Sequence, residues 1–263
     1  MAEPTGIANA EHDKHGMPKA IILFYKYAAL SDDKEKMSIL QDAFKTLCSK
    51  LNLTGRILLG ISADAEGING TLSGAEDDLE ACTIAMLGRG SDNRELDNRH
   101  RKIAEAFWVK SEEFAETASV APLFIDSKED FKWSKTVKSN EDMFPDLNIK
   151  IVKEIISTGG KLSSVKLSET KKGYLSPEEW HEEIRKLISS KEGDGTTDKG
   201  DTILIDCRNH KEFEIGRFVG AMDPNTKTFE QFPRWVEQNR AGLQGKKVLM
   251  YCTGGKSDIH LFS

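Results

Sequence analysis

The sequence predicts a mixed fold, in which an α+β domain is followed by a smaller parallel α/β unit. Two observations predict this division. Strand and helix signals alternate through residues 20–157, whereas residues 201–252 show a single β-α-β pattern. Between these parts, residues 189–200 are polar and glycine-rich without an apolar anchor, as is typical of a linker or a long loop.

Size and composition agree with two domains. The 263 residues are 38% hydrophobic and 30% charged, which is enough to bury a core and excludes a collagen, a coiled-coil rod and a wholly disordered chain. The net charge of −6 argues against nucleic-acid binding through bulk basicity. Charge is nevertheless uneven, because residues 1–149 hold 18 basic and 26 acidic side chains, whereas residues 199–251 hold 9 basic and 7 acidic ones.

The first elements follow the order β-α-β-β-α. Residues 20–27 (AIILFYKY) are rich in Ile and aromatic side chains, which is typical of a strand. Ser31 is the predicted cap of a helix, because apolar residues then recur at steps of three and four. Residues 55–61 and 68–74 are predicted as strands, and residues 75–87 as a second helix that starts with an acidic run.

Three further strands complete the predicted domain. They are residues 107–112 (FWVKSE), 131–137 (FKWSKTV) and 149–157 (IKIVKEIIS), whereas the charged residues 88–106 are ambiguous. The overall order β-α-β-β-α-β is a split βαβ pattern, so we expect a ferredoxin-like domain.

The second unit is predicted to be a parallel α/β arrangement. A helix begins at Pro177 and leads into the linker. Residues 201–208 and 246–252 are apolar runs typical of buried parallel strands, and residues 229–239 supply the crossover helix. Because open α/β sheets place their sites at the carboxyl ends of strands, we expect the functional site there.

The predicted organisation therefore has four parts. Residues 1–19 form a disordered tail, 20–157 the ferredoxin-like domain, 158–198 a helix and linker, and 199–263 the α/β unit. The tail is polar and has no arginine, unlike a signal or transit peptide.

We expect a cytoplasmic protein without membrane association. The longest apolar run has eleven residues and includes Lys26, so it is too short to span a bilayer. The four cysteines form no CxxC pair, which favours a reducing compartment over a disulfide framework or a zinc site. The residues identify no cofactor and no metal site, because the histidines share no metal-ligand spacing.

Cys252 is the strongest candidate for chemistry. It ends a predicted buried strand and is followed by Thr253, Gly254, Gly255 and Lys256. Two glycines after a cysteine allow backbone N–H groups to turn toward the sulfur and stabilise a thiolate or persulfide anion. The alternative is a buried cysteine at a strand end, followed by an ordinary Gly-Gly turn.

Supporting positions lie after the first strand of the α/β unit. Arg208 and Glu212 are candidates for shaping a substrate mouth, although a stabilising ion pair between them is the favoured alternative. Asp206 is predicted to cap the loop that follows it rather than to take part in chemistry.

In the first domain, Gly67, Asn69 and Gly70 are candidates for an RNA or phosphate contact. The favoured interpretation is a tight turn, because Asn-Gly is a common turn signal.

Several sequence blocks resemble a known family. DCRNHKEFEIGRFVGA (206–221) resembles the opening motif of rhodanese-like domains, and VLMYCTGG (248–255) resembles their active-site strand and loop. More narrowly, these blocks and others in the same order are similar to the tRNA uridine hydroxylase family, over about residues 20 to 255. The other blocks are GRILLG with AEGINGTLSG (55–74), DFKWS (130–134), FPDLNIKIVKEIIS (144–157) and GYLSPEEWH (173–181).

This resemblance implies a fold and an activity. It implies an acylphosphatase-like, ferredoxin-like N-terminal domain joined to a rhodanese-like domain. It also implies hydroxylation of the wobble uridine of tRNA at its 5-position, with molecular oxygen as co-substrate and Cys252 as the essential cysteine. It identifies no protein partner.

The chain departs from the family in its last residues. The family loop continues CTGGIRC before a helix, whereas this loop reads CTGGKSDIHLFS, with only eleven residues after Cys252. Ser257 stands where the family arginine is expected, and Lys256 lies one residue away. We therefore expect an incomplete rhodanese-like domain, truncated after the active-site loop, with weak or no catalysis. The alternatives are a persulfide-carrying sulfurtransferase and a non-catalytic interaction module.

Overall fold

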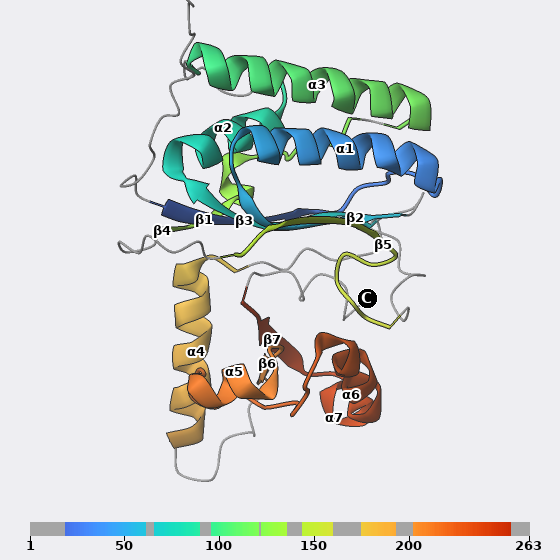
Figure 1. Ribbon diagram of the computed structural model, residues 1–263. Coiled ribbons are helices and arrows are strands. Elements are labelled where there is room, and N and C mark those ends of the chain that lie inside the picture. Colours follow the sequence, from blue (N-terminus) through green and yellow to red (C-terminus); the bar gives the residue numbers. More distant parts are fainter. Residues whose placement is uncertain are drawn as a thin grey trace, which may run out of the picture.

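A five-stranded sheet with helices stacked on one of its faces forms the N-terminal part of the protein (Figure 1). The computed structural model describes residues 19–61, 66–89, 96–120, 122–135, 144–159, 175–192 and 202–253. The strands of this sheet are β1 (Lys19–Lys26), β2 (Thr54–Gly60), β3 (Gly67–Ala75), β4 (Lys132–Lys135) and β5 (Leu147–Val152). The helices are α1 (Lys34–Lys50), α2 (Glu76–Leu87) and α3 (Asn98–Ala118), and a 3-10 turn, η1 (Lys128–Asp130), precedes β4.

The strand order confirms the predicted split βαβ arrangement. The order is β4-β1-β3-β2-β5, so β3 lies between β1 and β2 and is antiparallel to both. β4 pairs antiparallel with β1 at one edge, and β5 pairs parallel with β2 at the other. The ferredoxin-like sheet is thus extended by a fifth strand.

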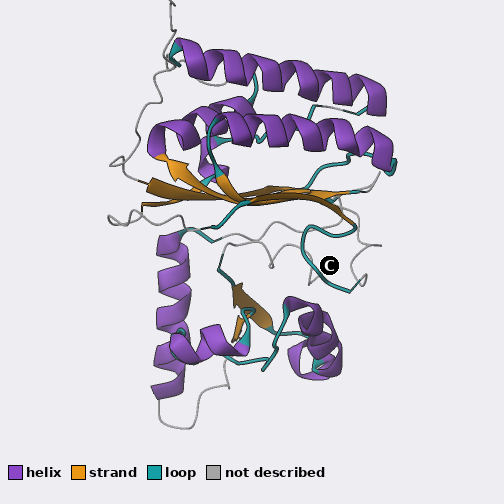
Figure 2. Ribbon diagram, viewed as in Figure 1, coloured by secondary structure: helices purple, strands orange, loops and turns teal. Residues whose placement is uncertain are grey.

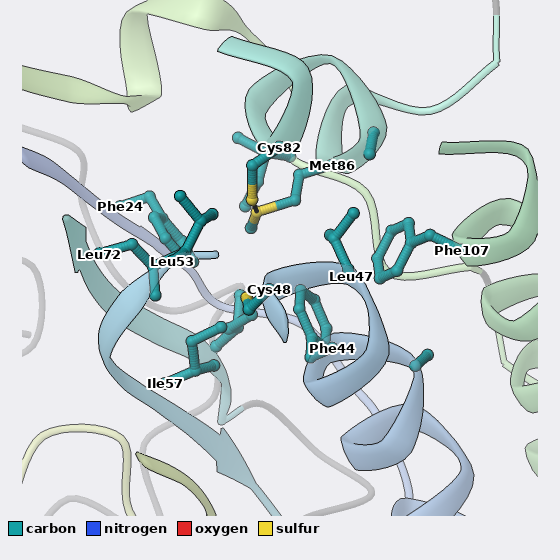
Figure 3. Close-up of a cluster of buried hydrophobic side chains, with 14 of the residues drawn as sticks. Phe24, Phe44, Leu47, Cys48, Leu53, Ile57, Leu72, Cys82, Met86 and Phe107 are labelled. Atoms are coloured by element: carbon teal, nitrogen blue, oxygen red, sulfur yellow. Dashed lines mark hydrogen bonds between the residues drawn. The ribbon is translucent and has the colours of Figure 1, made fainter. Parts of the chain in front are cut away.

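Alternation along β1 directs apolar side chains to the helical side of the sheet. Ala20, Ile22 and Phe24 are buried, whereas the residues between them are only partly covered. The helical side also holds two of the cysteines, Cys48 and Cys82, among the side chains drawn in Figure 3, and both are fully buried. The two cysteines therefore belong to the core of the domain.

Helix α1 is capped by Asp33 and not by Ser31. The Asp33 carboxylate accepts hydrogen bonds from the backbone N–H groups of Glu35 and Lys36. The Ser31 hydroxyl instead accepts from the Asp33 N–H at 3.1 Å. Ser31 thus shapes the turn before the cap, and the helix begins later than predicted.

The strand predicted at 107–112 is wrong, because these residues lie inside α3. Asp97 caps α3 through a hydrogen bond from the His100 N–H. Ala104, Phe107, Ser111 and Phe114 are buried along one side of the helix. α3 forms an outer layer over α1 and α2 (Figure 2), and the Phe107 ring meets Phe44 of α1 at 5.0 Å between centroids.

A smaller α/β unit lies on the opposite side of the sheet from α1 and α2 (Figure 1). Its strands β6 (Thr202–Asp206) and β7 (Lys247–Tyr251) are parallel, as predicted. Its other elements are α4 (Pro177–Glu192), α5 (His210–Ile215), η3 (Phe229–Gln231), α6 (Phe232–Gln238) and α7 (Arg240–Leu243). η3 and α6 occupy the predicted crossover helix, and α4 extends into the first residues of the predicted linker.

The two faces of the β6–β7 pair are covered by different elements. Leu204 and Leu249 pack against Ile184 and Leu187 of α4 on one face. On the other face, residues of β6 and β7 pack against Phe232 of α6 and Leu243 of α7. In the part of the chain that the structure describes, no helix has the length and apolar character needed to cross a membrane.

Candidate active site

Cys252 lies where the sequence predicts it, directly after the carboxyl end of a buried parallel strand. The last pair in register is Asp206 of β6 with Tyr251 of β7. Cys252 and Cys207 therefore leave the sheet side by side, at the edge where open α/β sheets place their sites. Cys252 is partly exposed, whereas Cys207 is buried at 3% exposure.

Asp206 is a buried carboxylate whose hydrogen bonds lie on the α4 face. It is 0% exposed and accepts from the Tyr251 hydroxyl at 2.7 Å. Arg208 donates to it through Nε at 2.9 Å, through Nη2 at 2.6 Å and through its backbone N–H at 3.0 Å. The last of these bonds confirms Asp206 as the cap of the following loop. Buried carboxylates need such partners, because an unpaired buried charge is costly.

These hydrogen bonds fix the charge state of Asp206. Burial raises the pKa of the carboxyl, but the hydrogen bonds from Arg208 and Tyr251 outweigh burial and hold the pKa below its ordinary value. Asp206 is therefore ionised at neutral pH. A permanently ionised carboxylate in this position suits a positioning role and not proton transfer near neutral pH.

Tyr251 is the site residue that the sequence analysis missed. Its ring packs against Phe218 at 4.9 Å and Trp180 at 6.1 Å between centroids, and the Arg208 guanidinium lies 5.4 Å from its ring centroid. Burial and the hydrogen bond to Asp206 raise the pKa of Tyr251 to about 12. The sequence did hold a signal for Tyr251. Successive side chains of a strand point to opposite faces, so Tyr251 is directed to the face opposite Cys252.

Glu212 connects the residue after Cys252 to helix α5. The Thr253 hydroxyl donates to Glu212 Oε1 at 2.8 Å. Glu212 is also part of a capping box with Asn209, in which each side chain bonds the other residue's backbone N–H. The described contacts thus fix Thr253 against the start of α5.

The ion pair predicted between Arg208 and Glu212 is not the one that forms. Arg208 pairs with Asp206, two residues earlier, because its side chain folds back over the end of β6. Glu212 is instead engaged by Asn209 and Thr253. Gly254, Gly255 and Lys256 lie outside the described residues.

The N-terminal candidates lie in the five-stranded sheet and not in a tight turn. Gly67, Asn69 and Gly70 are all part of β3. The Asn69 side chain donates to the Ile155 carbonyl at 2.8 Å, and Gly67 has a φ of +80° at the start of the strand. A Cβ on Gly70 would fall 2.2 Å from the Phe24 ring. The described contacts give all three residues a role in the sheet.

The ends of β6 and β7 carry a thiol nucleophile on one face of the strand pair and the ionic network of Asp206 and Arg208 on the other. Among the described residues, no group of three or more His, Cys, Asp or Glu side chains is placed to hold a metal ion. The chemistry that these side chains themselves offer is that of the Cys252 thiol.

Comparisons with known proteins identify a family for the N-terminal part and relatives that align over most of the chain. The family described as the UPF0176 acylphosphatase-like domain matches residues 19–155. The tRNA uridine(34) hydroxylase of Onion yellows phytoplasma (strain OY-M) is 29% identical over 235 residues, which are 89% of this chain and 57% of that protein. The tRNA uridine(34) hydroxylase of Brucella anthropi is 28% identical over 239 residues, 91% of this chain and 59% of that protein.

A third relative has a similar identity and coverage. The tRNA uridine(34) hydroxylase of Enterococcus faecalis is 29% identical over 239 residues, 91% of this chain and 57% of that protein. The alignments thus cover more of the chain than the acylphosphatase-like domain alone. The chain spans well under two thirds of the length of the curated relatives that it matches.

Proposed function

Since the chain belongs to the family of the UPF0176 acylphosphatase-like domain, we propose that it modifies tRNA by hydroxylating uridine 34, with Cys252 as the active-site cysteine. One observation carries the proposal. Relatives named tRNA uridine(34) hydroxylase align over 89–91% of the chain, so the alignments extend beyond the acylphosphatase-like domain at residues 19–155 into the α/β unit. The proposed reaction is the 5-hydroxylation of the base, and the proposed co-substrate is molecular oxygen.

The proposal assigns each part of the chain a role. Residues 20–157 are the acylphosphatase-like domain, 158–198 a helix and linker, and 199–263 a domain of rhodanese-like type. A half-buried thiol at the end of a parallel strand is a nucleophile held in a fixed position. Asp206, Arg208 and Tyr251 support the end of β7 from the opposite face, and Glu212 holds Thr253.

The proposed substrate requires a locally basic surface. A polyanion is bound through Lys and Arg, and residues 199–251 hold 9 basic and 7 acidic side chains, whereas residues 1–149 hold more acidic than basic ones. We therefore propose that tRNA approaches the α/β unit. A tRNA-modifying enzyme is expected to act in the cytoplasm.

Nucleoside analysis of treated tRNA tests the proposal. Purified protein is incubated in air with tRNA that lacks the modification, and the digested nucleosides are examined by mass spectrometry for 5-hydroxyuridine. We expect a low yield of the product with the unmodified chain, the same yield with Cys82→Ala, a control cysteine in the N-terminal core, and no product with Cys252→Ser. No product from the folded chain, or equal product from Cys252→Ser, overturns the proposal.

A persulfide-carrying sulfurtransferase is the second candidate. The same partly exposed thiol at a strand end can accept sulfur from thiosulfate and pass it on. Cyanide-dependent release of thiocyanate from thiosulfate distinguishes the two functions. Thiocyanate release that is lost in Cys252→Ser, without 5-hydroxyuridine formation, favours the sulfurtransferase.

A further inference from the structure

The strand register places two cysteines next to each other beyond the carboxyl ends of β6 and β7. Asp206 pairs with Tyr251, and the Cys207 N–H donates to the Tyr251 carbonyl at 2.9 Å, so the ladder continues one step past the strands. Neighbouring strands lie about 4.8 Å apart. Disulfide-bonded cysteines have Cα atoms about 4.4–6.8 Å apart, so this backbone spacing is compatible with a bond between Cys207 and Cys252.

Both side chains also lie on the same face. Ile205 and Cys207 belong to the cluster beneath α6 and α7, and Met250 and Cys252 pack against that cluster. The residues between them, such as Leu204 and Leu249, belong to the cluster under α4 on the opposite face. Alternation thus directs both thiols to the same side of the sheet.

The two thiols differ in their access to solvent. Cys252 is partly exposed, whereas Cys207 is 3% exposed, so a small oxidant in solution has better access to Cys252. The exposed thiol is therefore the one that is oxidised first, and the buried thiol is placed to react with it afterwards. This is the arrangement of a peroxide-sensitive cysteine with a resolving partner.

The chain contains a second neighbouring pair that serves as an internal comparison. Cys48 and Cys82 lie in the N-terminal core, where both are 0% exposed. The hydrogen bond with Cys82 and burial raise the pKa of Cys48, which favours the thiol form of Cys48. In both pairs the cysteines are neighbours, but only the pair of Cys207 and Cys252 includes a cysteine that is partly exposed to solvent.

We propose that Cys207 is the resolving cysteine of Cys252 and that the two form a reversible intramolecular disulfide on exposure to a peroxide. In the first step the Cys252 thiolate attacks one oxygen of hydrogen peroxide and the O–O bond breaks. Hydroxide leaves, and Cys252 becomes a sulfenic acid. In the second, the Cys207 thiol attacks the Cys252 sulfur, the S–O bond breaks and water leaves. The two sulfurs lose two electrons in total and the peroxide is reduced to water. The inference stands without the proposed function, because its product is the disulfide itself.

Peptide mapping of the full chain tests the inference. The protein is treated with hydrogen peroxide, blocked with N-ethylmaleimide and digested with trypsin without reductant. Trypsin is expected to release Cys207 in the peptide 200–208 and Cys252 in the peptide 248–256. We expect these peptides joined, with the loss of two hydrogen atoms and release by dithiothreitol, whereas Cys48 and Cys82 become alkylated only after unfolding.

Two variants complete the test. Cys252→Ser is expected to leave Cys207 reduced, and Cys207→Ala is expected to let Cys252 proceed to the sulfinic acid, since no thiol then intercepts the sulfenic acid. Circular dichroism checks that each variant is folded, and the wild-type peptide map needs no variant. Either of two results overturns the inference. In the first, Cys252 of the wild type is oxidised to the sulfinic acid and no joined peptide is found. In the second, Cys252 is joined to a cysteine of a second chain.

Discussion

Replacing Gly70 by alanine tests whether this residue is required for packing against Phe24. Gly70 of β3 lies opposite Phe24 of β1 in the sheet register. The Cβ of alanine would fall 2.2 Å from Cζ of the Phe24 ring and 2.6 and 2.7 Å from its Cε atoms. Carbon atoms in contact settle at about 3.5–4.0 Å, so the ring would have to move by more than about 1 Å.

The ring has little space for such a movement. Phe24 is 0% exposed, and Phe131 packs against it at 5.6 Å between centroids. Overpacking of a core costs about 1–3 kcal/mol. We therefore expect Gly70→Ala to lower the free energy of unfolding by about 1–3 kcal/mol, as measured by urea titration followed by circular dichroism.

A double-mutant cycle identifies the clash as the cause. Phe24→Leu removes the ring, so Gly70→Ala should cost less in that background, with a coupling of about 0.5–3 kcal/mol. Gly242→Ala in α7 is the matched control, because nothing lies within 4 Å of its added Cβ. It should be neutral or stabilising by up to about 1 kcal/mol. A cost for Gly70→Ala that is unchanged in the Phe24→Leu background refutes the packing argument.

Three other predictions follow from buried polar groups. Since the pKa of Tyr251 is raised to about 12, its ultraviolet ionisation step should follow those of ordinary tyrosines, at about 10, and vanish in Tyr251→Phe. The stability that Tyr251 contributes should be present below about pH 10 and be lost as the pH rises through the folded pKa, which urea titrations at several pH values measure. Asp78 is 2% exposed and accepts from Arg99 at 2.9 Å, so Asp78→Ala should cost about 1.5–3 kcal/mol in a urea titration, against about 0–1 for Asp42→Ala in an exposed pair. The pKa of Cys48 is raised by its hydrogen bond with Cys82 and by burial. Cys48 should therefore resist alkylation by iodoacetamide at pH 8 until urea unfolds the domain, which mass spectrometry measures. Rapid alkylation of Cys48 in the native protein would contradict its buried position.

Elements with a strong period in the sequence were predicted well. β1, β2, β3, β6 and β7 alternate or form continuous apolar runs, and the structure has strands at all of them. The prediction failed at α3, where Phe107, Trp108 and Val109 gave a local β preference. The buried residues Ala104, Phe107, Ser111 and Phe114 recur at three- and four-residue steps, but the smaller of them, Ala104 and Ser111, carry little hydrophobic signal.

The candidate site was predicted in position but not in its contacts. Cys252 follows from the end of a strand, because strand ends are visible in the sequence. The partner of Arg208 is set by how its side chain folds back on Asp206, and no spacing rule decides between an acid two residues before and one four residues after. The proximity of Cys207 and Cys252 depends on the register of β6 against β7, which is a property of the folded sheet.

The outer strands of the five-stranded sheet have a consequence for the order of folding. β1, β2 and β3 are close in the sequence, whereas β4 joins β1 through pairs such as Ile22 with Trp133, and β5 joins β2 through pairs such as Arg56 with Asn148. Such distant pairings require the closure of long loops before any contact is gained, so they form slowly. We expect β1, α1, β2, β3 and α2 to assemble as a nucleus and the two edge strands to be added last. The segment that leaves β5 toward the α/β unit would then be anchored to the sheet only after β5 has paired with β2.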